Sequence, residues 1–226
     1  MFLLNYETLI DPLLRDLRLF LSEFGGLKAG EKVLDVCCGT GVQAIEYARR
    51  GIIATGIDLD TAMLKTAERK RSESGLSNLE FRLADAASLP FAGGSFDAAS
   101  ISLALHGKTA DVREKVVAEM QRVVKQGGIL LFADFNAPLP GNFDTFVLNS
   151  IEYIAGREHY RNSRDYLDSG GLGRILARHN IVAGKTDYLK NGNFLLIKAR
   201  NPGQYWPAQL SCDVIRQGLQ TQIPHS

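Results

Sequence analysis

The stretch VLDVCCGTG at residues 33–41 decides the fold, because an apolar run leads directly into a glycine-rich turn. A strand that ends in Gly39-Thr40-Gly41 and continues into a helix brings the backbone close to a ligand. The N–H groups at the start of that helix then point towards the ligand. Cys37 and Cys38 stand where further glycines would be expected. The stretch predicts a buried strand followed by a ligand-binding turn.

Two carboxylates beside this turn indicate the kind of ligand. Asp58 ends the next apolar run, where a carboxylate accepts hydrogen bonds from both hydroxyls of a ribose, at about 1.5–3 kcal/mol each. Asp35 precedes the glycines and would repel a pyrophosphate but attract an ammonium group. S-adenosylmethionine carries an ammonium and a sulfonium and no phosphate, so the charges favour it. The spacing of Gly39, Gly41 and Ala44 also fits a dinucleotide site, which stays open as an alternative.

On either side of this stretch, apolar runs typical of buried strands alternate with the periodic pattern of amphipathic helices. Apolar runs predict strands at 32–37, 52–57, 79–84, 96–103 and 128–135, and helical patterns lie between several of them, at 41–50, 60–74 and 109–126. Such alternation predicts an α/β fold with a parallel sheet and helices on both faces. The segments on either side of Asn191-Gly192 predict an antiparallel hairpin within 181–200.

We expect a single domain over residues 1–226. Residues 1–30, with a helical stripe over 6–24, would form an N-terminal lid, and residues 31–135 the cofactor-binding core. Two helices near 143–156 and 163–179 would make 136–180 a substrate-binding insertion, and no function is predicted for the tail, 201–226.

Composition narrows the class of protein. Lys and Arg number 26 and Asp and Glu 25, a balance that argues against a dedicated nucleic-acid binder. Charged residues interrupt the apolar N-terminus, so we expect no signal peptide and no membrane span. Three cysteines, at 37, 38 and 212, suit a reducing compartment, and we expect a cytoplasmic protein. The oligomeric state stays open.

Several segments together resemble one family. DVCCGTG at 35–41 resembles the D/E-x-G-x-G-x-G motif of class I S-adenosylmethionine-dependent methyltransferases, and GIDLD, LADAASLPF and SFDAAS follow in the expected order. RVVKQGGILL at 122–131 is similar to a signature of the ubiquinone/menaquinone-biosynthesis type. The resemblance implies a Rossmann-like sheet of seven mostly parallel strands with a reversed last strand. It also implies S-adenosylmethionine as cofactor and S-adenosylhomocysteine as product.

The resemblance also implies individual roles. Asp35 and the carbonyl of Ser102 would receive the ammonium, the turn would approach the methionyl group, and Asp58 would bind the ribose. The implied cofactor-binding residues are Asp35, Cys37, Gly39, Thr40, Gly41, Asp58, Leu59, Met63, Asp85, Ala86 and Ser102. Leu59 and Met63 would flank the adenine, while Asp85 and the Ala86 N–H would bind its edge. Cys37 occupies the first glycine position of the motif, which a small residue can fill if its φ stays negative.

Some of these residues also have purely structural interpretations. Asp85 could cap the next turn, Met63 could belong to the core, and Asp60 is expected to cap the helix that follows it. Cys37 and Cys38 lack further ligands at a recognised spacing, so we expect no metal site.

His106 follows the fourth predicted strand, where a methyl acceptor would lie. It is our candidate catalytic base, although a structural loop histidine fits the sequence equally well. Tyr6, His159 and Tyr160 are candidate substrate-binding residues, because they belong to the two segments that could cover the site.

The expected function is in-line methyl transfer to a small-molecule acceptor. Positioning of the two reactants alone lowers a barrier by about 7–11 kcal/mol, so a base is optional for some acceptors. Two alternatives remain: a nicotinamide-dependent oxidoreductase, and a non-catalytic module that binds S-adenosylmethionine.

Overall fold

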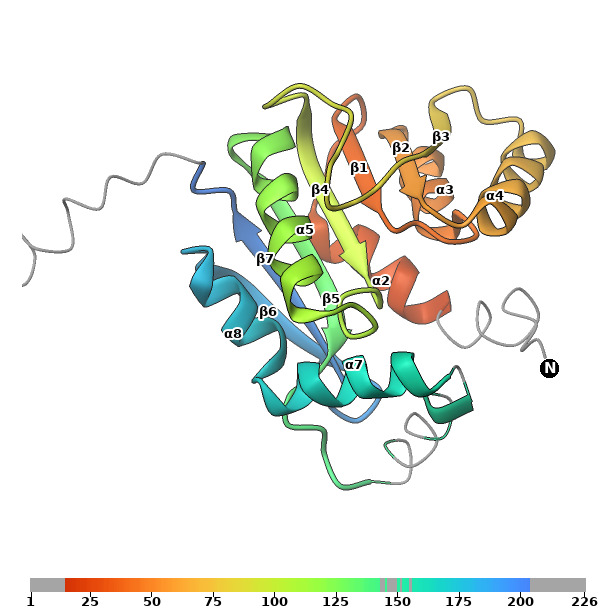
Figure 1. Cartoon of the computed structure of the whole chain (residues 1–226). Coiled ribbons are helices and arrows are strands. Elements are labelled where there is room, and N and C mark those ends of the chain that lie inside the picture. The colour runs from red at the N-terminus through yellow and green to blue at the C-terminus, as the bar shows by residue number, and fades with distance from the viewer. Residues whose placement is uncertain (1–14, 143–144, 146–149, 151, 155, 204–226) are drawn as a thin grey trace, which may run out of the picture.

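The protein is described from a computed structural model that covers residues 15–142, 145, 150, 152–154 and 156–203 (Figure 1). Seven strands form one sheet in the order β3-β2-β1-β4-β5-β7-β6. Neighbours from β3 to β5 are parallel, whereas β7 runs antiparallel to both β5 and β6. The strands are β1 Lys32–Val36, β2 Ile53–Asp58, β3 Leu79–Leu83, β4 Phe96–Ser102, β5 Val124–Phe135, β6 Ala183–Leu189 and β7 Phe194–Arg200. The predicted sheet and its reversed last strand are confirmed.

Helices cover both faces of this sheet, and one crosses its end. In Figure 1, α5 and α8 lie in front of the sheet, α2 and α3 lie behind it, and α4 flanks the β3 edge. The teal helix α7 crosses below the ends of β4 and β5, which are the carboxyl ends of the parallel strands. The helices are α2 Arg15–Gly25, α3 Val42–Arg49, α4 Thr61–Ser74, α5 Ala110–Val123, α7 Arg157–Asp168 and α8 Gly171–Arg178.

The central strand β1 is buried from Val33 to Val36 because both of its faces are covered, and Asp35 is the one charged residue in this buried stretch. Val33, Leu34 and Val36 have no exposed surface, as expected for a parallel strand between two helical layers. After β2, the side chain of Asp60 accepts hydrogen bonds from the N–H groups of Ala62 and Met63 and so caps α4. The prediction of this cap is confirmed.

Two predicted helices differ from the observed ones in where they end. The helix expected at 109–126 ends at Val123, because Val124 already has an extended backbone with a ψ of 138° and begins β5. The helix expected at 163–179 is two helices, α7 and α8, separated where Gly170 and Gly171 adopt φ values of 96° and 57°. Glycine takes these left-handed conformations at little cost, whereas a continuous helix excludes them. Between β3 and β4, residues 84–95 form turns and irregular structure.

The N-terminal helix contributes to the core where it is described. Leu17, Leu21 and Phe24 on α2 are buried, and Ser22 accepts a hydrogen bond from Gln43 on α3 at 2.8 Å. This part of the segment predicted as a lid therefore packs behind the sheet. Residues 1–14, with Tyr6, and residues 204–226 lie outside the described residues.

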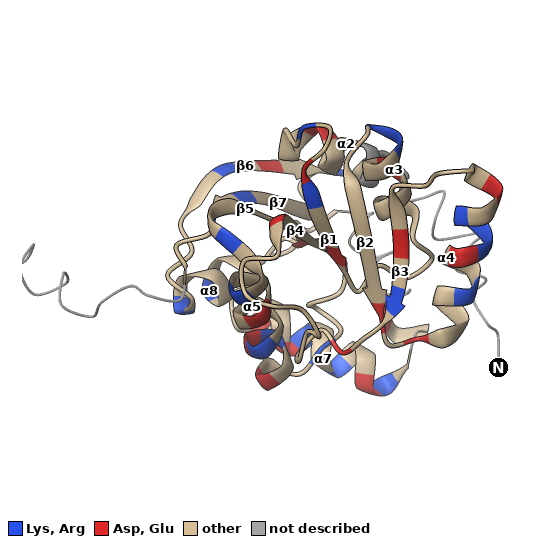
Figure 2. Ribbon diagram, turned by 90° about the horizontal axis from the view of Figure 1, so that it is seen from above, with Lys and Arg blue, Asp and Glu red and all other residues tan. Residues whose placement is uncertain are grey.

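Charges of both signs are mixed on the helices. Figure 2 shows Lys and Arg beside Asp and Glu on α4 and around α5 and α7. On α4, Arg69 pairs with Glu73 at 2.8 Å and Arg71 pairs with Glu68. Among the described helices, none is long and apolar enough to cross a membrane.

Candidate active site

The glycine turn and Asp58 meet at the carboxyl ends of β1 and β2. The Gly39 N–H donates a hydrogen bond to Oδ2 of Asp58 at 2.8 Å, and the Asp60 N–H donates to Oδ1 at 2.9 Å. Parallel pairing of the two strands fixes this meeting, since Val36 lies opposite Ile57. Two predicted cofactor elements, 19 residues apart in sequence, are therefore in direct contact.

The two glycines of the turn have different roles. A Cβ atom added at Gly39 would meet nothing within 4 Å, so the backbone there faces open space. A Cβ atom at Gly41 would lie 2.3 Å from Cζ of Phe81 and 2.8 Å from Cβ of Ala67. Gly41 thus permits packing against β3 and α4, and Gly39 is the position where a ligand can approach the backbone. Thr40 between them is buried.

Cys37 departs from its expected conformation. Its φ is 56°, in the left-handed region, whereas the sequence argument required a negative φ. The turn has a left-handed backbone at the first motif position. A glycine adopts this conformation easily, whereas a side chain there is strained. The condition of a negative φ, under which a small residue fills this position without strain, is therefore not met. Burial raises the pKa of the Cys37 thiol to about 11, and the neighbouring ammonium of Lys108 opposes the rise.

Asp35 belongs to a buried polar cluster between β1, β4 and α3. It is 1% exposed, and its Oδ1 accepts a hydrogen bond at 2.9 Å from the hydroxyl of Ser100, its partner in the strand register. Tyr47 on α3 reaches the same region, and burial followed by the charge of Asp35 raises its pKa. Asp35 therefore supplies negative charge just behind the glycine turn.

The predicted adenine-binding residues surround Asp58. Ala84, next to Asp85, donates its N–H to the Asp58 carbonyl at 3.1 Å, which brings the end of β3 beside the end of β2. Leu59 is 62% exposed and Met63 is half-buried. Asp85 is exposed and accepts a hydrogen bond from the Ala87 N–H at 2.8 Å, so it caps the following turn, while Ala86 is buried.

His106 is buried and held by Asp134 at the end of β5. Nδ1 of His106 lies 2.6 Å from Oδ1 of Asp134, and the N–H groups of Leu105 and His106 donate to Oδ2 at 2.9 and 3.2 Å. The imidazole ring also stacks on Phe135, with centroids 4.3 Å apart. Burial alone lowers the pKa of His106, but the charge and hydrogen bond of Asp134, together with Glu152, raise it above its ordinary value.

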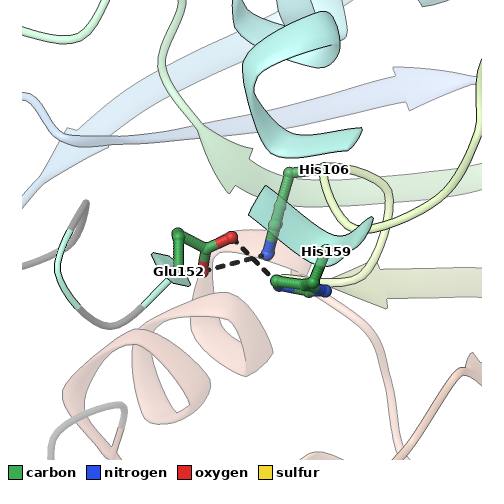
Figure 3. A group of neighbouring side chains, drawn as sticks. All are labelled: His106, Glu152 and His159. Atoms are coloured by element: carbon green, nitrogen blue, oxygen red, sulfur yellow. Dashed lines mark ion pairs between the residues drawn. The ribbon is translucent and has the colours of Figure 1, made fainter. Parts of the chain in front are cut away.

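His159 lies beside His106, whereas Tyr160 does not. The two imidazole rings are 5.4 Å apart at an angle of 85°, and Nε2 of His159 is 2.9 Å from Oε2 of the buried Glu152 (Figure 3). A Cβ atom at Gly107 would lie 2.4 Å from the His159 ring, so this glycine makes room for it. Tyr160 packs instead against Tyr153, with centroids 5.7 Å apart.

The loop after β4 links His106 to the cofactor turn. Ser102 ends β4 and is half-buried, and Leu103 follows with a φ of 52°. A positive φ in a leucine is uncommon, and such strained residues cluster at functional sites. Lys108 on this loop is near enough to the Cys37 thiol for its positive charge to lower the pKa of the thiol. His106 therefore lies on the same loop that touches the predicted cofactor site.

Sequence reasoning missed four residues of this region. The charges of this region lie on Asp134, Glu152, Lys108 and the buried Arg113. Arg113 donates hydrogen bonds to the Leu105 carbonyl at 3.1 Å and to Asp165 at 2.7 Å. An acid in the apolar run GILLFADF was the only available signal, for Asp134. Nothing in the pattern singled out the other three.

Comparisons with known proteins agree with this arrangement. A family model described as a methyltransferase domain matches residues 33–128. The chain is 40% identical over 193 residues to a demethylmenaquinone methyltransferase of Desulfitobacterium hafniense, covering 77% of this chain and 75% of that protein. It is 38% identical over 136 residues to a demethylmenaquinone methyltransferase of Renibacterium salmoninarum, covering 58% and 54%. The matches to this and several other curated relatives span about half of each relative.

The solved structures agree on the fold. An S-adenosylmethionine-dependent methyltransferase from Aquifex aeolicus superposes with a TM-score of 0.67 at 20% identity, covering 87% of this chain and 97% of that one. The strand order and the turn facing Asp58 define a Rossmann-like adenosine-binding domain. The chain belongs to the class I S-adenosylmethionine-dependent methyltransferases of the ubiquinone/menaquinone-biosynthesis type. The predicted family is confirmed.

Proposed function

We propose that the protein transfers the methyl group of S-adenosylmethionine to a small molecule that carries a hydroxyl group on an aromatic ring. The observation that carries this proposal is the loop after β4, which holds the buried His106–Asp134 pair and also reaches Cys37 through Lys108. A proton acceptor and a cofactor turn thus share one edge of the sheet. The ring chemistry is taken from the names of the relatives, demethylmenaquinone methyltransferases.

The residues at the turn fit the cofactor. Gly39 faces open space, Asp58 offers a carboxylate beside it, and Leu59 offers exposed apolar surface for an adenine. The negative charge of Asp35 behind the turn suits an ammonium group better than a phosphate. When bound, S-adenosylmethionine supplies an electrophilic methyl group.

The chain's own contribution is positioning and movement of a proton. Asp134 fixes Nδ1 of His106, so Nε2 is the atom left to polarise or deprotonate an acceptor hydroxyl. Loss of that proton raises the electron density of the ring oxygen and of the carbons beside it. In the net reaction the acceptor gains a methyl group and releases one proton, and S-adenosylhomocysteine is the other product. We place this reaction in the cytoplasm, in keeping with the cysteine content.

The test combines binding with turnover. We expect S-adenosylhomocysteine to bind in calorimetry and NAD not to, and mass spectrometry to detect a methylated product with hydroquinones in preference to amines. Binding of S-adenosylhomocysteine without turnover across hydroquinones, phenols and amines would indicate a non-catalytic module instead.

A further inference from the structure

We propose that His106, Glu152 and His159 together bind one divalent transition-metal cation. The three side chains come from different segments, the β4 loop, the helical residues 152–154 and α7, and they point towards one another (Figure 3). One nitrogen or oxygen from each lies within 4.8 Å of the other two. Two imidazoles and one carboxylate form a ligand set that divalent iron, cobalt, nickel and zinc accept.

The separations are close to those of a coordination sphere. Bonds of about 2.0–2.2 Å place neighbouring ligands about 3.0–3.6 Å apart. Nε2 of His106 is 3.6 Å from Oε1 of Glu152, and Nε2 of His159 is 2.9 Å from Oε2. Side-chain rotations would therefore suffice to bring the three atoms onto one ion.

The surroundings of His106 are those of a metal ligand. Metal-binding histidines commonly donate their other ring N–H to a carboxylate, which fixes the tautomer and the ring orientation. Asp134 occupies this position at 2.6 Å from Nδ1, and stacking on Phe135 holds the ring plane. His159 is positioned by its contact with Gly107, and its Nε2 is the nitrogen that faces Glu152.

Glu152 is the residue that a purely structural role explains least well. It is 6% exposed, and its Oε2 accepts no hydrogen bond from the described residues, although His159 lies 2.9 Å away. The atoms of the pair are close but do not align as a hydrogen bond. A buried carboxylate normally has hydrogen-bond partners for its oxygens. A cation between the three groups would satisfy this oxygen and both imidazoles together.

The site would act on an oxygen of the methyl acceptor, and this consequence rests on the proposed function. Three protein ligands leave coordination positions for water or substrate oxygen. A hydroxyl bound to the cation loses its proton more readily, since the metal stabilises the oxyanion. With the cation bound, Nε2 of His106 is a ligand and cannot accept a proton, so the cation takes over the polarising role proposed for this nitrogen and the acceptor proton leaves to water.

Cation binding is tested directly on the full chain after dialysis against a chelator. We expect Zn²⁺ to bind in calorimetry with one ion per chain, and Co²⁺ to give the visible absorption of a nitrogen–oxygen site. Glu152→Gln and His159→Gln should each weaken Zn²⁺ binding by about tenfold or more. His179→Gln is the matched control, because His179 also pairs with a glutamate, Glu114 at 2.8 Å, away from the cluster, and should bind Zn²⁺ as the wild type does.

Three results would overturn the inference. These are no Zn²⁺ binding, equal affinity in the wild type and in a folded His159→Gln variant, or a cobalt–thiolate band, which would place the ion on cysteines. His159 is partly exposed, so its variant is expected to fold even if Glu152→Gln does not. Methyl transfer that persists without Zn²⁺ binding would refute the metal site and keep the proposed function. Zn²⁺ binding by the cluster without methyl transfer would refute the proposed function and keep the metal site.

Discussion

At the scale of single residues, the glycine turn after β1 combines strain with open space. Cys37 holds a left-handed φ of 56° in the position that a glycine fills in the family motif. A side chain in this conformation costs about 1–2 kcal/mol relative to a right-handed one. Gly39, two residues later, has the same kind of conformation without this cost. The turn therefore tolerates the cysteine rather than requiring it.

Replacement of Cys37 by glycine should stabilise the protein. We expect Cys37→Gly to raise the free energy of unfolding in urea by about 1 kcal/mol, because it removes the strain at φ 56°. Cys38→Ala is the control, since Cys38 is not among the described residues with a positive φ. A loss of stability in Cys37→Gly would show that packing of the thiol outweighs the strain.

The two thiols should resist alkylation in the folded protein. Burial raises the pKa of Cys37 from 9.0 to about 11, and burial and Asp35 raise that of Cys38. A raised pKa favours the folded state below pH 9, and this contribution is lost as the pH rises from 9 through about 11. At about pH 8, iodoacetamide should label both residues in urea but neither in buffer, as read by peptide mass spectrometry. Both thiols are partly exposed, so fast labelling of Cys37 in the native protein would contradict its raised pKa.

Asp58 should matter for the cofactor more than for the fold. Asp58→Ala is expected to weaken S-adenosylhomocysteine binding by about tenfold or more, because it removes a charged hydrogen-bond acceptor. Asp58→Asn, which keeps one oxygen for the Gly39 N–H, should bind better than the alanine variant. Asp60→Ala is the control, expected to lose about 1 kcal/mol of stability as a helix cap while keeping its affinity. Unchanged calorimetric affinity in Asp58→Ala would remove Asp58 from the site.

At the scale of secondary-structure elements, one side chain joins three of them near the acceptor side. The hydroxyl of Tyr166 on α7 donates to the Phe135 carbonyl at the end of β5 at 3.0 Å and accepts from the Leu172 N–H on α8 at 3.1 Å. Tyr166 is fully buried. The position of α7, and of His159 on it, therefore depends on this hydroxyl.

Removal of the hydroxyl should be costly because Tyr166 and both of its hydrogen-bond partners are buried. We expect Tyr166→Phe to lower the free energy of unfolding by about 1–3 kcal/mol, since a buried N–H and a buried carbonyl lose their partner. Tyr188→Phe on β6, at a residue that is 54% exposed, is the matched control and should change little. Equal urea midpoints for the two variants would contradict the joining role.

At the scale of the whole molecule, strand order places the site. In the sheet, β1 has β2 on one side and β4 on the other. The connection that leaves β1 runs towards β2, and the one that leaves β4 runs away from β1 towards β5, so the two diverge at the carboxyl ends of β1 and β4. Ligands of open α/β sheets bind where such connections diverge. Asp58 and His106 come from loops on opposite sides of this point.

Ligand binding at such a central position should stabilise the entire domain. At a hundredfold excess over its Kd, S-adenosylhomocysteine adds about 2.7 kcal/mol to stability. For a chain of this size we expect a rise in Tm of about 5–10 °C in a thermal melt. NAD should cause no shift, and a shift with NAD alone would revive the dinucleotide alternative.

Much of the fold and part of the site could be predicted because their signals are local. The apolar run before Gly39, the Asp60 cap and the Asn191-Gly192 hairpin each depend on neighbours in sequence. The length of α5 and the division between α7 and α8 were mispredicted. Helical periodicity does not show that Val124 already adopts an extended backbone, nor that Gly170 and Gly171 adopt left-handed conformations.

The sequence by itself determined the family, the sheet with its reversed strand and the glycine turn after β1, because motif residues act through backbone conformation and short spacings. Only the tertiary structure decided that Cys37 is strained and that Asp134 holds His106. It also decided that Glu152 and His159 meet His106 at one point. These contacts join His106 to segments 28 to 53 residues away in the sequence. Strand order and the placement of α7 bring these segments together, and no local sequence pattern encodes either of them.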